Sequence, residues 1–375
     1  MTGTTTGETT VGATSAAGGA QGATPGAVTV PDAGTGPGLP GAGSQDGVRG
    51  TGIRGTGGRG IGTRRTGAVY AALGMAMVGS LVAVSGTFDD APLFAVQALR
   101  YLLAAAILAL VLRGAGRAAP RPRGREWAWL AGVALSGLVL FNVAVVRGVE
   151  HAEPAVIGVA VAAVPVLLAL VGPLAARSWP APAVVAGAVV VTAGAVLVTG
   201  GGRTDAAGVG YALLTLVCEA GFTLLAVPVL RRLGPHGVTL HATWIAAAGF
   251  VVLSLTAEGP AAVLALEPDH LLATLHLAVF VTVVAFLLWY TAVGRLGPGR
   301  AGLFTGVVPV TSAVGGVLLG EPVPGPAVWF GIVVVAIGVG VGMRAGPDHS
   351  SDRRIPRTRA RRSETWRSNP RSLGE

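Results

Sequence analysis

The sequence contains no lysine, because all 27 of its basic residues are arginines. A chain without lysine cannot supply the lysine of a phosphate-binding P-loop, a Schiff base or a pyridoxal phosphate enzyme. We therefore do not expect the protein to be an ATPase in its own right, and we expect no cofactor.

Cysteine is nearly absent as well. The single Cys218 excludes an intramolecular disulfide and a CxxC metal or redox site. The GxSxG and HExxH motifs do not occur, the 6 histidines are scattered or in loops, and no aspartate lies in an apolar run. An intramembrane hydrolase would need one of these sets. We expect neither an enzyme nor a metal site.

Charged residues are scarce: they make up 12% of the chain, whereas soluble domains carry about 25%. Hydrophobic residues make up 51%, and the mean hydropathy is +0.66. This composition predicts an integral membrane protein. The two ends differ, because residues 1–65 are rich in Gly, Thr, Ala and Pro, and residues 344–375 are rich in arginine. We predict that both are disordered tails.

Ten apolar segments separate these tails, each of about 20 residues, the length that crosses a bilayer as a helix. Charged residues, glycines and prolines lie between successive segments. The predicted spans are 67–87, 92–112, 127–147, 154–175, 181–200, 207–228, 237–257, 270–291, 299–319 and 324–343.

The loop charges predict the orientation. If the N-terminus is cytoplasmic, ten loop arginines fall inside and only Arg147 and Arg203 fall outside, in agreement with the positive-inside rule. Both termini are then cytoplasmic, in a plasma (inner) membrane. The ten inner arginines are Arg113, Arg117, Arg121, Arg123, Arg125, Arg177, Arg231, Arg232, Arg295 and Arg300.

The chain also repeats itself. A shift of 144 residues places four prolines and two glycines on equivalents: Pro154 on Pro298, Pro165 on Pro309, Pro180 on Pro324, Pro182 on Pro326, Gly187 on Gly331 and Gly194 on Gly338. Two five-helix repeats are predicted, at 66–200 and 206–343. Because five is odd, the second repeat enters the membrane inverted, which is the architecture of many secondary transporters.

Three stretches carry a family resemblance: ALRYLLAAAILAL (98–110), AAVPVLLAL (162–170) and LGEPVPGPAVWFGIVVVAIGVG (319–340). With the two five-helix halves, they resemble the EamA-type permeases of the drug/metabolite transporter superfamily. The first copy departs from the family at Ala176-Arg177, where the second has Gly320-Glu321. The resemblance implies an all-α carrier, often an exporter, for small metabolites such as amino acids.

Glu219 is the first candidate for a substrate- or proton-binding residue. It lies about 18 Å into its predicted span, close to the middle of the bilayer, where a charge is costly. Thr215 and Thr223 share its helix face. The alternative is a structural acid that is permanently protonated.

Arg100 is the second candidate, about 12 Å into its span. It requires a carboxylate, carbonyls or water, and we predict that it pairs with Glu219; the alternative is snorkelling to the outer interface. Its repeat equivalent is His241, and His241 with Trp244 is favoured as an interfacial pair rather than a site.

Asn142, Trp289 and Tyr290 are weaker candidates, because Trp and Tyr near helix ends are more often interfacial anchors. Pro154, Pro165, Pro298 and Pro309 are predicted helix hinges. The pairs Ala183-Gly187 and Ala327-Gly331 suit close packing within the chain or between the subunits of a homodimer.

The sequence therefore predicts a secondary transporter whose partners are a small molecule and the lipid bilayer, with no nucleic acid. Proton coupling is one expectation. A channel, or a membrane subunit of a larger transport complex, is the main alternative.

Overall fold

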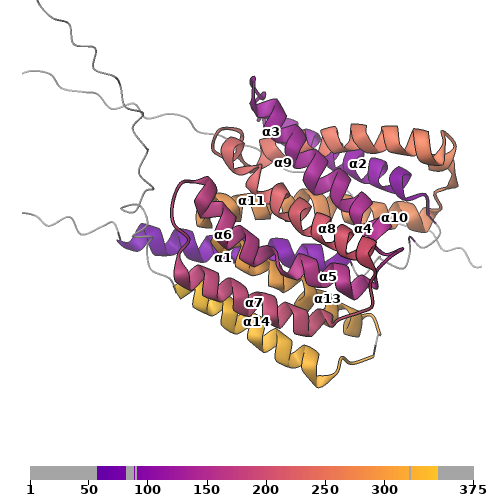
Figure 1. Cartoon of the computed structure of the whole chain (residues 1–375). Coiled ribbons are helices and arrows are strands. Elements are labelled where there is room, and N and C mark those ends of the chain that lie inside the picture. Colours follow the sequence, from indigo (N-terminus) through magenta and orange to yellow (C-terminus); the bar gives the residue numbers. More distant parts are fainter. Residues whose placement is uncertain (1–56, 82–87, 89–90, 321, 345–375) are drawn as a thin grey trace, which may run out of the picture. The chain divides into compact units, whose positions relative to one another are not determined.

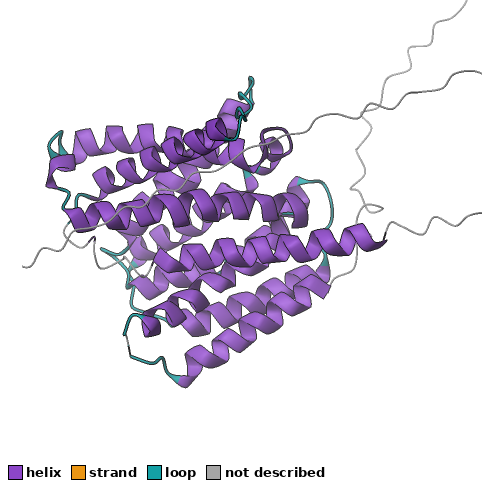
Figure 2. Cartoon of the chain, turned by 180° about the vertical axis from the view of Figure 1, so that it is seen from behind, coloured by secondary structure: helices purple, strands orange, loops and turns teal. Residues whose placement is uncertain are grey.

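The computed structural model describes residues 57–81, 88, 91–320 and 322–344, and these residues form helices and loops without a strand (Figures 1 and 2). One isolated bridge joins Ala152 to Thr204 between two loops. Most of both predicted tails, together with Asp89, Asp90 and Glu321, lies outside the described residues.

The helices of the first half follow the predicted spans, and some spans are divided into shorter helices. They are α1 (Gly57–Gly79), α2 (Leu93–Gly114), α3 (Glu126–Val133), the π-helical turn η2 (Ala134–Leu140), α4 (Phe141–Gly148), α5 (Pro154–Ala162), α6 (Val164–Ala175) and α7 (Pro182–Thr199).

The second half contains equivalent helices in the same order. They are α8 (Ala206–Leu224), α9 (Val227–Leu253), the π-helical turn η3 (Ser254–Glu258), the 3₁₀ turn η4 (Ala262–Ala265), α10 (Pro268–His276), the π-helical turn η5 (Leu277–Val284), α11 (Ala285–Leu296), α12 (Pro298–Gly302), the 3₁₀ turn η6 (Leu303–Gly306), α13 (Val307–Leu318) and α14 (Pro326–Arg344).

Nine helical stretches of the described chain are long and apolar enough to cross a membrane, and they match nine of the ten predicted spans. The first predicted span, 67–87, differs. It corresponds to α1, which begins at Gly57, so residues 57–65 of the predicted tail are helical. Residues 82–87, which end that predicted span, lie outside the described residues.

The predicted break between residues 228 and 237 takes the form of a kink. Helix α9 runs from Val227, but Gly234 interrupts it with φ 67° and ψ 173°, and Pro235 follows. A positive φ is unstrained for glycine alone, and proline cannot donate a backbone hydrogen bond to the preceding turn. The predicted break is therefore present as two helical pieces that meet at Gly234, the first ending before it and the second beginning at Pro235.

The predicted hinge prolines lie at helix starts and breaks. Pro154 and Pro298 are the first residues of α5 and α12. Pro165 follows the break at Ala163, and Pro309 follows η6. The π-helical turns η2 and η5 also fall at equivalent places, in the third and eighth spans. Backbone irregularities thus occur in matching positions of the two halves.

Equivalent helices of the two halves pack against each other. Helices α7 and α14 lie side by side (Figure 1), with Gly187 against Gly338 and Gly342, and Gly194 against Gly331. Residue numbers rise along one helix as they fall along the other, so the two helices are antiparallel. A Cβ atom at Gly187 would come within 2.7 Å of backbone atoms of α14. The predicted small-residue contact therefore lies within one chain, and it gives no support to a homodimer.

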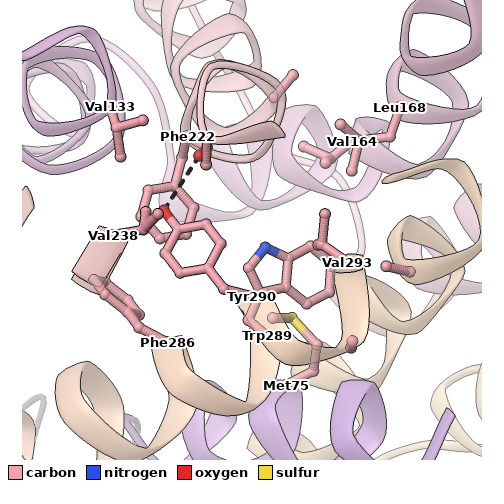
Figure 3. Packing of buried hydrophobic residues seen from close by; sticks show 14 of the residues in the cluster. Met75, Val133, Val164, Leu168, Phe222, Val238, Phe286, Trp289, Tyr290 and Val293 are labelled. Carbon is pink, nitrogen blue, oxygen red and sulfur yellow. Dashed lines mark hydrogen bonds between the residues drawn. The ribbon is translucent and has the colours of Figure 1, made fainter. Parts of the chain in front are cut away.

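The same antiparallel relationship holds elsewhere. Gly172 of α6 faces Pro298 of α12, while Leu168, one turn earlier, faces Gly302. Helix α2 packs along α9 in the same way, because Phe94 binds Glu258 while Tyr101, later in α2, stacks on Phe250, earlier in the seventh span. The main hydrophobic core extends across both halves and contains Trp289 and Tyr290 (Figure 3).

Candidate functional site

Arg100 lies inside the bundle on α2, with 7% of its surface exposed. Its Nε donates a hydrogen bond of 2.8 Å to the hydroxyl of Thr282 in η5, and its Nη1 donates to Gln97 Oε1 at 3.4 Å. The guanidinium carbon lies 5.1 Å from the centre of the Tyr101 ring, within the range of a cation–π interaction. Arg100 does not snorkel to the interface, because its side chain is bonded inside the bundle.

Asn142 belongs to the same cluster. Its Oδ1 accepts a hydrogen bond from Gln97 Nε2 at 2.7 Å, and its Nδ2 donates to Leu138 O at 2.6 Å and to the Tyr101 hydroxyl at 3.4 Å. The π-helical turn η2 ends just before Asn142, at Leu140. A continuous chain of hydrogen bonds therefore joins the second, third and eighth spans. We call its members the Arg100 cluster: Gln97, Arg100, Tyr101, Asn142 and Thr282.

The Arg100 cluster contains no acid. Among the described residues the ion pairs are Arg147–Glu150, His151–Asp205, Arg203–Glu153 and Arg232–Glu126, all at helix ends or in loops. Arginine remains protonated in proteins. The cluster therefore carries one buried positive charge that neutral groups alone contact.

Glu219 lies on α8, half-buried, on the helix between Thr215 and Thr223. Thr215 donates to the carbonyl of Tyr211, and Thr223 accepts a hydrogen bond from Trp289 Nε1 at 3.1 Å. In the described part of the chain, no hydrogen bond or ion pair reaches the Glu219 carboxylate. The predicted pairing of Arg100 with Glu219 is thus not present in this conformation.

Trp289 and Tyr290 lie beside the Glu219 helix in the eighth span. They are 2% and 0% exposed, and the Tyr290 hydroxyl donates to Phe222 O at 3.3 Å (Figure 3). The alternative that Trp289 and Tyr290 anchor a helix end at the lipid interface is wrong, because both side chains are inside the core.

His241 and Trp244 lie apart from both groups. Trp244 is 42% exposed, and its Nε1 donates to His241 Nδ1 at 3.1 Å. His241 Nε2 is 3.1 Å from the carbonyl of Pro120 in the loop after α2, and Trp127 packs edge-on against the imidazole. A carbonyl only accepts, so Nε2 carries the proton. An exposed aromatic group of this kind is typical of a membrane interface.

A cavity of about 430 Å³ opens between α5, α7 and the η6–α13 segment. Its lining is mainly apolar, with hydroxyl groups from Thr199, Thr305 and Ser312, and it includes the predicted hinge Pro309. Neither Arg100 nor Glu219 lines this cavity. The described residues contain no group of three or more His, Cys, Asp or Glu side chains that could hold a metal ion.

Sequence reasoning missed three members of the Arg100 cluster. Gln97 precedes Arg100 by one helical turn, so its spacing was an available signal. Tyr101 looks like an ordinary apolar-face aromatic residue in the sequence, and Thr282 is 182 residues from Arg100. Only the fold identifies them.

Comparison with known proteins gives consistent results. The model of the EamA-like transporter family matches twice, at residues 65–200 and 206–343. The chain is 27% identical over 267 residues to the "Uncharacterized transporter YetK" of Bacillus subtilis (strain 168), covering 68% of this chain and 80% of that protein.

A solved structure described as "Crystal structure of protein" has a TM-score of 0.64 and 21% identity, covering 74% of this chain and 96% of that one. This likeness shows a shared fold. The two family matches together cover most of the sequence, and they confirm the resemblance found in the sequence. The protein is a multi-pass membrane transporter, not an enzyme, and it belongs to the EamA-like transporter family.

Proposed function

We propose that this protein is a secondary carrier that exports a small metabolite, such as an amino acid or a related compound, across the plasma membrane by alternating access. Both termini are cytoplasmic, and the second family copy is inverted relative to the first. The observation that carries the proposal is the antiparallel packing of α7 on α14, α6 on α12 and α2 on α9. Carriers with inverted repeats bind substrate where the repeats meet.

Two features support a movement of the two copies against each other. The backbone breaks at equivalent positions, near Pro165 in one copy and near Pro309 in the other. The π-helical turns η2 and η5 are also equivalent and flank the Arg100 cluster. Breaks of this kind free backbone carbonyls and act as hinges in membrane helices.

The binding residues in this proposal are those in the interior. Glu219 exchanges a proton or binds a substrate amine, because it is an acid within an apolar span with no hydrogen-bonding partner among the described residues. Arg100 and Asn142 bind substrate, and Trp289 and Tyr290 form the wall beside Glu219. His241 and Trp244 fit the interfacial interpretation better.

Counterflow tests the proposal. Proteoliposomes are loaded with an unlabelled amino-acid mixture, and trace labelled amino acids are added outside, with and without a pH gradient. A carrier exchanges labelled for unlabelled substrate, so the label accumulates transiently above its outside concentration. A channel, or a subunit that needs a larger complex, produces no such overshoot.

A further inference from the structure

We propose that Arg100 binds the carboxylate of a substrate that has a single carboxylate group and no other anionic group. The proposal rests on the transport function proposed above and specifies the chemical class of its substrate. It starts from the unbalanced charge of the Arg100 cluster.

The charge argument has two parts. A buried arginine costs several kcal/mol unless another charge or several hydrogen bonds compensate it. Around Arg100 the described acceptors are two neutral oxygens, of Thr282 and Gln97, and the second contact is long at 3.4 Å. An anion from solution would complete the compensation when the site is occupied.

The guanidinium has an unused edge. Nε is committed to Thr282 and one N–H of Nη1 to Gln97, whereas Nη2 donates to no described residue. Three side-chain polar atoms of the described residues are fully buried without a hydrogen-bond partner, and Arg100 Nη2 is not one of them. Part of the Nη2 surface is therefore accessible. One N–H of Nη1 and both N–H groups of Nη2 therefore remain, and donors on two adjacent guanidinium nitrogens match the two oxygens of a carboxylate.

The surrounding residues hold this edge in place. Asn142 holds Gln97 at 2.7 Å, and Gln97 in turn contacts Nη1. Thr282 is itself fixed by its hydrogen bond to Leu277 O in η5. The Tyr101 ring lies 5.1 Å from the guanidinium carbon. Such preorganisation lowers the entropic cost of binding.

The single charge follows from the composition of the cluster. Arg100 is its one cation, and the other members are neutral. A monocarboxylate brings the occupied site to zero net charge. A phosphate ester or dicarboxylate would leave an excess negative charge in an apolar span. That charge is as unfavourable as the uncompensated positive charge of Arg100 in the empty site.

Binding to the purified full-length protein in detergent tests this directly. The probes are benzoate and hexanoate, each compared with its neutral amide. We expect the wild type to bind each acid about 10- to 100-fold more tightly than its amide, which is the range of a charge-assisted hydrogen-bonded pair. Arg100→Gln should bring acid and amide to equal affinity, and Arg147→Gln, at an exposed helix end, should leave the preference unchanged.

A matched pair of variants at Thr282 leaves Arg100 itself unchanged. Thr282→Asp places a permanent carboxylate beside Nε, so it should abolish the preference for acids. Thr282→Asn has the same shape as Thr282→Asp without the charge, so it should reduce the preference for acids less than Thr282→Asp does. Equal affinity of the wild type for acid and amide, or no binding of either acid, would overturn the proposal, as would full acid preference in Thr282→Asp.

The binding result is independent of transport. Acid-specific binding without counterflow of any amino acid would retain the Arg100 site and contradict the carrier proposal. Counterflow of a compound that lacks a carboxylate, without acid-specific binding, would support the carrier proposal and overturn the Arg100 site.

Discussion

Glu258 at the end of the seventh span caps the start of α2. Its two carboxylate oxygens accept hydrogen bonds from the backbone N–H groups of Phe94 at 2.7 Å and Ala95 at 2.9 Å, which lie 164 and 163 residues earlier in the sequence. These amides belong to the first turn of the helix that carries Arg100. The first turn of a helix has no internal partners for its N–H groups, and a carboxylate there also interacts favourably with the helix dipole.

Glu258→Ala should destabilise the protein by about 0.5–2 kcal/mol, the usual cost of losing an N-terminal cap. Hydrogen exchange measures the local effect, because the amides of Phe94 and Ala95 should exchange faster in the variant. Glu150→Ala, which removes an exposed acid, is the control. Unchanged protection at both amides would show that the cap contributes nothing to α2.

Gly338→Ala should disrupt the contact between α7 and α14. A Cβ at this position would lie 2.6 Å from the backbone nitrogen of Val191, closer than real Cβ atoms approach. We expect a loss of thermal stability of about 1–3 kcal/mol, typical of overpacking. Gly340→Ala is the matched control on the same helix, because a Cβ there meets nothing within 4 Å. Equal melting temperatures for the two variants would exclude this packing.

Asn142→Leu should weaken the Arg100 cluster. It removes the acceptor of Gln97 and the donor to Tyr101 and Leu138, so we expect a loss of about 1–3 kcal/mol from polar groups left unsatisfied. Thermal unfolding in detergent measures it. Ser136→Ala loses only a bond to Gly132 within its own helix and should cost less. A larger cost for Ser136→Ala would contradict the network.

Reporter fusions test the inverted second copy. Fusions after Arg125 and after Arg232 should report a cytoplasmic location, and a fusion after Asp269 should report an external one. The reason is the arginine bias of the loops, since arginine-rich short loops remain inside. A cytoplasmic reporter at Asp269 would rule out the inversion.

Much of the fold was accessible from the sequence, because apolar length and proline or glycine breaks follow directly from bilayer physics. Pro154 and Pro298, which the 144-residue shift places on each other and which were predicted as hinges, are both the first residues of helices. The π-helical turns η2 and η5 were not predicted, because a single extra residue in a uniformly apolar segment leaves no trace in hydropathy. The break at Gly234 was predicted, because two arginines and a Gly-Pro pair interrupt the apolar pattern there.

The candidate site was predicted in parts. Charge in an apolar run identified Arg100 and Glu219, but it could not show their partners, and the predicted pairing between them is absent in this conformation. Arg100 instead contacts Thr282, which a residue-type argument does not distinguish from any other threonine. Polar partners that come from distant spans depend on helix rotation, which packing determines.

The pH dependence of transport by Glu219→Gln tests the central claim most directly. Counterflow by the wild type and by Glu219→Gln is measured across a pH series, with Glu150→Gln as the control for an exposed acid. If Glu219 exchanges a proton or binds a substrate amine, Glu219→Gln should insert normally, transport at a strongly reduced rate, and lose the pH dependence that the wild type and Glu150→Gln share. Wild-type rates with an unchanged pH profile in Glu219→Gln would reduce Glu219 to a structural acid and contradict the account.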